Sequence, residues 1–138
     1  MTNQLPELSG KTILRIDTDN DSFIKFYLSD GNLVTMQHHQ DCCENVYLEN
    51  VVGDFKNLLY SPIIQADEKI TQGGEQGCET HTYTFYTLAT VKGYVDLRWN
   101  GESNGYYSES VDFSTDSYDL TSLPNYQHLK DNYPEAFI

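Results

Sequence analysis

The sequence predicts an α+β fold in which one or two short helices pack against a mostly antiparallel sheet of about six or seven strands. Three observations lead to this prediction. β-branched and aromatic residues recur with period two, turn dipeptides such as Asp30-Gly31 separate these segments, and one central segment changes to helical spacing. The 138 residues fit a single domain over 1–138, because domains cluster around roughly 100–150 residues.

Three strands are expected in the N-terminal part. Lys11–Asp17 and Phe23–Ser29 are separated by the polar segment Thr18–Ser22, which predicts a turn. Asp30-Gly31 then predicts a type I′ hairpin, because both central positions need a positive φ that Asp and Gly tolerate. Leu33–His39 is the returning strand.

The same polar turn begins like a calcium loop, with Asp17, Asp19 and Asp21 at alternate positions. The resemblance then ends, because Ser22 occupies the place of the glycine and Leu28 the place of the bidentate glutamate. A hairpin turn is therefore the better interpretation.

The middle of the chain changes period. Val46–Glu49 is expected to be a short strand, and Val51–Leu59 has apolar residues at three- and four-residue spacing, which predicts a helix of two to three turns. Ser61-Pro62 ends this helix, since a residue before proline is disfavoured in helical geometry. Ile63–Ile70 is expected as a strand and Thr71–Glu79 as a glycine-rich loop.

The last strands are expected to form a meander. His81–Val91 and Tyr94–Trp99 are joined by a tight turn at Lys92-Gly93, and Tyr106–Phe113 follows a looser turn at Asn100–Gly105. In the tail, residues 121–138 predict a short helix with Ser122 as its N-cap.

The charge balance excludes some partners. Eight Lys and Arg against 21 Asp and Glu give a net charge of −13, which argues against direct binding to nucleic acid or to anionic membranes. This acidity can serve solubility, or it can imitate a phosphate backbone and attract a protein with a basic surface. From Glu102 to the C-terminus there are seven acids and one Lys or Arg, Lys130. With no apolar run of membrane-spanning length and no signal-peptide pattern in MTNQLPELSG, we expect a soluble, cytoplasmic protein.

The most distinctive surface candidate is the segment GESNGYYSE at 101–109. Tyrosines bury contact area at low entropic cost, and carboxylates add charge. We predict a partner-binding patch made of Glu102, Tyr106, Tyr107, Glu109 and Asp112. Strand alternation places Glu109 on the apolar side, where Arg98 is one candidate partner for it. The alternatives are a plain hairpin turn and glycosidase chemistry by Glu102 with Glu109.

Histidine and cysteine residues gather in two short segments. His39 precedes Cys42 and Cys78 precedes His81 by three residues, a spacing that lets each pair reach one tetrahedral zinc ion. The alternatives are ordinary packing residues with reduced thiols, or a cysteine nucleophile paired with histidine. No cofactor is expected other than this possible zinc.

The segments MQHHQDCCENVYLE, ETHTYTFYTLAT and GYVDLRWNGESNGYYSESVDF resemble a family of small uncharacterised proteins from phages and related bacterial elements. The similarity covers about Met36 to Phe113. It implies a small accessory protein, and no catalytic or ligand role is carried over from it.

We therefore expect a non-enzymatic, phage-type accessory protein that binds and inhibits a host or defence protein, by imitating nucleic-acid charge. The alternative is a zinc domain with a structural or hydrolytic site. A third hypothesis is sequestration of a small ligand such as a nucleotide, which would require Arg98 to line a pocket.

Overall fold

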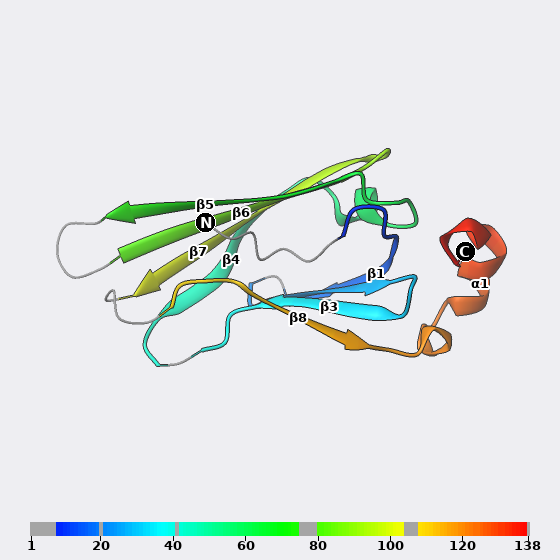
Figure 1. Cartoon of the computed structure of the whole chain (residues 1–138), viewed down its shortest axis with the longest axis horizontal. Helices are drawn as coiled ribbons and strands as arrows, with labels where there is room; N and C mark the ends of the chain where they lie inside the picture. Colours follow the sequence, from blue (N-terminus) through cyan, green and yellow to red (C-terminus); the bar gives the residue numbers. More distant parts are fainter. Residues whose placement is uncertain (1–7, 20, 41, 75–79, 104–107, 138) are drawn as a thin grey trace.

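A computed structural model describes residues 8–19, 21–40, 42–74, 80–103 and 108–137, which build two four-stranded antiparallel sheets lying face to face (Figure 1). The first sheet has the order β1-β2-β3-β8 and the bounds Ile13–Thr18, Phe23–Leu28, Asn32–Gln37 and Asp112–Ser117. The second sheet has the order β4-β7-β6-β5 and the bounds Asn45–Val52, Gly93–Ser103, Thr80–Thr90 and Gln65–Gly74.

The N-terminal hairpins follow the alternation of the sequence. In β2, Ile24, Phe26 and Leu28 are buried while the residues between them are partly exposed. The turn from β2 to β3 contains Asp30-Gly31, but the predicted type I′ geometry is wrong, because Gly31 has a φ of +89° whereas the φ of Asp30 is not positive. The three predicted strands and their antiparallel pairing are confirmed.

The prediction of one sheet with six or seven strands in an α+β fold is wrong, because the described chain is mostly β and has eight strands in two sheets. The mostly antiparallel pairing is confirmed. The expected meander ends at β7, and the last strand, β8, crosses over and pairs with β3, so that Met36 lies opposite Phe113. Alternation indicates which face of a strand is buried, but it does not indicate which strand lies beside it.

The expected helix at Val51–Leu59 is also wrong. Strand β4 continues to Val52, and a 3₁₀ turn, η1 (Phe55–Leu58), follows. Gly53 separates them with a φ of +104°, and a Cβ at this position would lie 2.5 Å from the carbonyl oxygen of Tyr94. The regularly spaced apolar residues still reach the core, because they lie at the end of β4 and in or next to η1.

Two boundaries differ from the predictions. β5 runs on to Gly74, through part of the expected Thr71–Glu79 loop, and β7 runs on to Ser103. The helix predicted in the tail is confirmed as α1 (Tyr126–Asn132), but it begins after Asn125, and Ser122 belongs to a separate 3₁₀ turn. That turn is η2 (Leu120–Ser122), and another 3₁₀ turn, η3 (Pro134–Phe137), follows α1.

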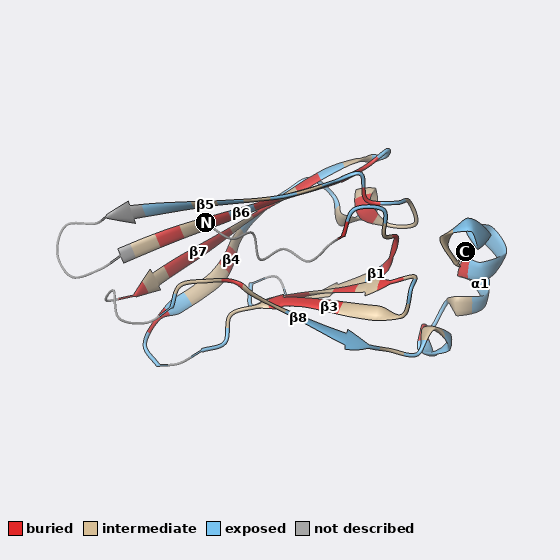
Figure 2. Cartoon of the chain, in the orientation of Figure 1, coloured by how far each residue is buried: buried red, intermediate tan, exposed pale blue. Residues whose placement is uncertain are grey.

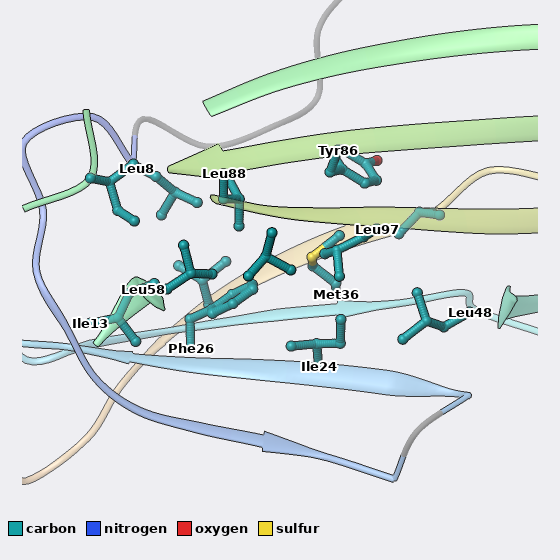
Figure 3. Packing of buried hydrophobic residues seen from close by; sticks show 14 of the residues in the cluster. Leu8, Ile13, Ile24, Phe26, Met36, Leu48, Leu58, Tyr86, Leu88 and Leu97 are labelled. Atoms are coloured by element: carbon teal, nitrogen blue, oxygen red, sulfur yellow. The ribbon is translucent and has the colours of Figure 1, made fainter. Parts of the chain in front are cut away.

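The core lies between the two sheets, and Figure 2 shows that strands of both sheets carry buried residues. Figure 3 shows Ile24, Phe26 and Met36 of the first sheet pointing toward Leu88 and Leu97 of the second. Burial of apolar surface of this kind contributes about 25 cal/mol per Å² removed from water.

A second, smaller cluster lies between the C-terminal segment and β1. Leu14 is buried with Leu123 and Leu129, and the ring of Tyr118 contacts Tyr27 edge-on at 5.2 Å between centroids. Among the described residues, no helix is both long enough and apolar enough to cross a membrane.

Candidate functional site

The segment 108–111 carries the chain from the second sheet toward the first and lies over the inner face of β7. Gly101 makes this approach possible, since a Cβ there would lie 2.6 Å from the carbonyl oxygen of Glu109. The Glu109 carboxylate accepts a hydrogen bond of 2.7 Å from Thr82 of β6 and another from the hydroxyl of Ser103. It therefore faces the interior, as predicted, although residues 108–111 precede β8 and are not part of the strand whose alternation gave this prediction.

A cleft of about 360 Å³ opens beside this segment. The Glu109 carboxylate lines this cleft, and so does that of Glu68 on β5. Glu68 accepts a 2.8 Å hydrogen bond from the hydroxyl of Tyr86. Two acidic residues and no basic residue occur among the described residues of its lining, which are Glu68, Ile70, Gln72, Thr82, Thr84, Tyr86, Ser108, Glu109, Ser110 and Val111. The cleft combines negative charge with hydroxyl groups and a small apolar surface.

The protonation of Tyr86 follows from its surroundings. Burial raises the pKa of its phenol well above the ordinary value, and the hydrogen bond to Glu68 raises it further. Tyr86 is therefore protonated at neutral pH and acts as a donor to Glu68. This bond holds the Glu68 carboxylate in one position at the cleft.

His38, at the end of β3, connects this segment to the loop that precedes β4. Its Nδ1 lies 2.7 Å from the carbonyl oxygen of Ser110, and its Nε2 lies 2.7 Å from Oε2 of Glu44. A carbonyl oxygen can only accept, so Nδ1 carries a proton. Oε1 of Glu44 accepts a bond of 2.9 Å from the backbone N–H of Cys42. This chain of bonds fixes one wall of the cleft.

The structure describes three of the five predicted partner-binding residues, and these three do not share one surface. Glu102 lies on the outer face of β7, where its Oε1 is 3.2 Å from Nδ2 of Asn100, whereas Glu109 points to the inner face of the same sheet. Asp112 begins β8 and accepts a bond from the backbone N–H of His39. Tyr106 and Tyr107 lie outside the described residues.

The pairing suggested for Glu109 is wrong. Arg98 lies on the outer face of the second sheet, and its Nη2 is 2.6 Å from Oε1 of Glu49. The reason is the alternation of β7, because Arg98 and Glu102 point outward whereas Trp99 and Gly101 point inward. The partners of Glu109 include the hydroxyl groups of Thr82 and Ser103.

The zinc prediction concerns residues that the structure describes only in part. His39 is exposed, Cys42 is joined to Cys43 by a disulfide, and His81 lies on β6 with its Nδ1 3.7 Å from Glu102. Cys78 lies outside the described residues. In the part of the chain that is described, no three His, Cys, Asp or Glu side chains are arranged to hold a metal ion. An oxidised Cys42 is not a thiolate ligand, so such a site would require reduction of this disulfide.

β1 and β2 pair as an antiparallel hairpin, as expected, and Asp19 lies just after the end of β1. The carboxylate of Asp19 accepts bonds from the backbone N–H groups of Ser22 and Phe23, at 2.7 and 3.1 Å. These bonds, together with the Ser22 hydroxyl as the largest cause, lower the pKa of Asp19 to about 2. Its oxygens thus stabilise the turn between β1 and β2.

Sequence reasoning missed three residues of the candidate site: Glu44, Glu68 and Tyr86. Each is separated by at least 23 positions from Glu109 along the chain, and only the sheet order brings Glu68 and Tyr86 to the cleft. One signal was available, because an acidic residue in the middle of a predicted strand, as Glu68 is, requires either a wet edge or a hydrogen-bond partner.

Comparison with known proteins gives one match. Neither the curated proteins nor the solved structures include a match to this chain. A family model matches residues 6–113, which contain strands β1 to β7 and all described residues of the cleft. The matched region ends just after β8 begins, so most of β8 and the C-terminal segment lie beyond it. The chain therefore belongs to the family described as domain of unknown function (DUF7448).

Proposed function

We propose that the protein is a small acidic accessory protein, of the phage type that its sequence resembles, which binds and inhibits a host or defence protein through that protein's basic surface. The observation that supports this most directly is the cleft, whose described lining includes the carboxylates of Glu68 and Glu109 and no basic residue. We propose binding, without catalysis, as its mode of action.

The chemistry of the cleft fits a lysine or arginine side chain of the partner. Carboxylates accept the strong, charge-assisted hydrogen bonds that guanidinium and ammonium groups donate. Hydroxyl groups hold both carboxylates in place, so little ordering is needed when a ligand enters. Ile70 and Val111 offer apolar contact for the methylene stem of such a side chain.

The charge of the whole chain supports the same proposal. A net charge of −13 attracts a basic protein over a distance of about a Debye length, which is roughly 8 Å at physiological ionic strength. Such a field raises the association rate, and it resembles the field of a nucleic-acid backbone. We propose on this basis that the partner is a protein whose basic surface otherwise contacts nucleic acid.

The test begins with capture of a protein from a lysate of the host, followed by its identification and purification. Affinity is then measured by calorimetry for the wild type and for the double variant Glu68→Gln with Glu109→Gln. We expect the double variant to bind at least about tenfold more weakly, because charge-assisted bonds are lost. A DNA duplex should compete with the acidic protein for the same partner.

A matched control removes the same charge elsewhere. Asp116 and Glu135 are exposed and lie outside the cleft, so Asp116→Asn with Glu135→Gln should change the affinity by less than about threefold, through the general field alone. Equal losses of affinity in both double variants would show that the cleft carboxylates contribute no more to binding than acidic residues elsewhere. A captured partner without a basic surface would contradict the proposal as a whole.

A further inference from the structure

A second concave site lies on the outer face of the second sheet, on the side that points away from the first sheet (Figure 1). It is a groove of about 250 Å³. Strand β7 forms its floor, between β4 and β6, and its described lining consists of Asn50, Val52, Phe85, Thr87, Asp96, Leu97 and Arg98. Glu109 lies on the opposite face of this sheet, so the groove is separate from the cleft.

The strand register arranges the lining in two rows. Arg98 pairs with Phe85 of β6 and with Asn50 of β4. Two residues earlier on β7, Asp96 pairs with Thr87 and with Val52. Leu97, between the rows, points into the core, so its backbone forms the floor of the groove.

The polar groups of the groove are held in position and include both donors and acceptors. The guanidinium group of Arg98 is oriented by Glu49 at 2.6 Å. The carboxylate of Asp96 accepts a 2.7 Å bond from the hydroxyl of Thr87, and Asn50 presents an exposed amide. Guanidinium, carboxylate and amide groups are planar and can each engage two neighbouring hydroxyl groups of a ligand.

Apolar surface is exposed in the same groove. Phe85 is 36% exposed and Val52 is 46% exposed, although both are large hydrophobic residues. The Phe85 ring is supported by Tyr83, at 6.5 Å between centroids and an interplanar angle of 29°. A rigid aromatic ring of this kind, next to fixed polar groups, is typical of a site for a flat ligand with polar edges.

From these observations we infer that the groove binds a single ring of a neutral carbohydrate. A pyranose ring has an apolar C–H face that can pack on Phe85, and hydroxyl groups that both donate and accept toward Arg98, Asp96 and Asn50. The two carboxylates, Asp96 and Glu49, outnumber the guanidinium group, so an anionic ligand such as a nucleotide is disfavoured. The volume lies below the roughly 300–1,000 Å³ of drug-sized pockets, which fits one ring.

The test uses saturation-transfer NMR on the full chain with four probes, the methyl glycosides of glucose, galactose, mannose and N-acetylglucosamine, and with L-leucine as a zwitterionic comparison. We expect at least one glycoside to receive saturation from the protein. Phe85→Ala and Asp96→Ala should each weaken its binding by at least about tenfold, because they remove the stacking ring and a fixed acceptor.

The matched control is Tyr94→Ala, which removes an exposed aromatic ring from the same face of β7 but outside the groove, and it should bind as the wild type does. Circular dichroism of all three variants checks that each is folded. If Asp96→Ala fails to fold, Asp96→Asn replaces it, with a smaller loss expected. No response from any glycoside, a response from L-leucine alone, or undiminished binding by Phe85→Ala would overturn the proposal.

Discussion

Nε2 of His38 lies 2.7 Å from Oε2 of Glu44, and these side chains are only 3% and 0% exposed. Nδ1 of the same ring lies 2.7 Å from the carbonyl oxygen of Ser110, so the imidazole joins the loop before β4 to a segment 72 residues further along the chain from His38. When one partner of a buried hydrogen-bonded pair is removed, the other partner is left with an unsatisfied polar group, which lowers stability. This pair therefore determines how firmly the wall of the cleft is attached to β3.

Replacement of Glu44 by alanine should lower the free energy of unfolding by about 1–3 kcal/mol, as expected when a buried hydrogen-bonding group loses its partner. The measurement is a urea titration followed by tryptophan fluorescence, since Trp99 is the only tryptophan. Exposed Glu135 provides the control, because Glu135→Ala should change stability by less than about 0.5 kcal/mol. Similar midpoints for the two variants would contradict the role of the pair.

The substitution Gly101→Ala should disturb the cleft, although it replaces none of the residues that line it. The added methyl group would lie 2.6 Å from the carbonyl oxygen of Glu109 and 2.8 Å from its Cβ, so the segment 108–111 has to move. We expect a loss of about 1–3 kcal/mol, as is usual for overpacking. Amide chemical shifts should change at Thr82 and Ser110 but stay constant in β2, and shifts confined to residue 101 would contradict this prediction.

Acid should weaken the turn between β1 and β2. The folded-state pKa of Asp19 is lowered to about 2 from 3.8, so its stabilising effect is complete above pH 3.8 and is lost as the pH falls toward 2. Because Asp19 is exposed, we expect Asp19→Asn to cost about 1 kcal/mol at neutral pH and less at pH 2. Thermal melts of both proteins at several pH values check this. A difference that does not shrink in acid would exclude the carboxylate as the cause.

Alkaline conditions should weaken the attachment of the C-terminal segment. Burial raises the pKa of Tyr118 to about 12, and its hydroxyl donates a 2.6 Å bond to the carbonyl oxygen of Leu28. The stabilisation is therefore complete below pH 10 and is lost as the pH rises toward 12. Tyr118→Phe should cost about 1 kcal/mol at pH 7 and should reduce the loss of stability above pH 10. Tyr133→Phe, at a more exposed ring, is the control.

The local features of the fold could be predicted because they depend on neighbours in sequence. The hairpin between β2 and β3 follows from the Asp30-Gly31 turn signal, in which Gly31 takes the positive φ. The helix expected at Val51–Leu59 did not form because Gly53 approaches the backbone of Tyr94, a contact between different strands that spacing does not reveal.

The candidate sites were harder to predict, because they depend on the order of strands in the sheets. Glu68 and Tyr86 meet because β5 pairs with β6 in a register that places them directly opposite one another. Similarly, Asn50 and Phe85 both flank Arg98, since β7 lies between β4 and β6. Neither arrangement can be derived from the period of a single segment.

The position of β8 bears on how the chain avoids self-association. β8 pairs with β3 at six positions, from Asn32 opposite Ser117 to Gln37 opposite Asp112. Most of β8 lies beyond residue 113, where the family match ends. Without it, β3 would expose a row of unpaired backbone groups, which is a template for strand addition by another molecule. Ser114, Thr115, Asp116 and Ser117 make the new edge short, polar and charged. Asp116 thus places a charge on the exposed edge, the kind of residue that opposes addition of another strand.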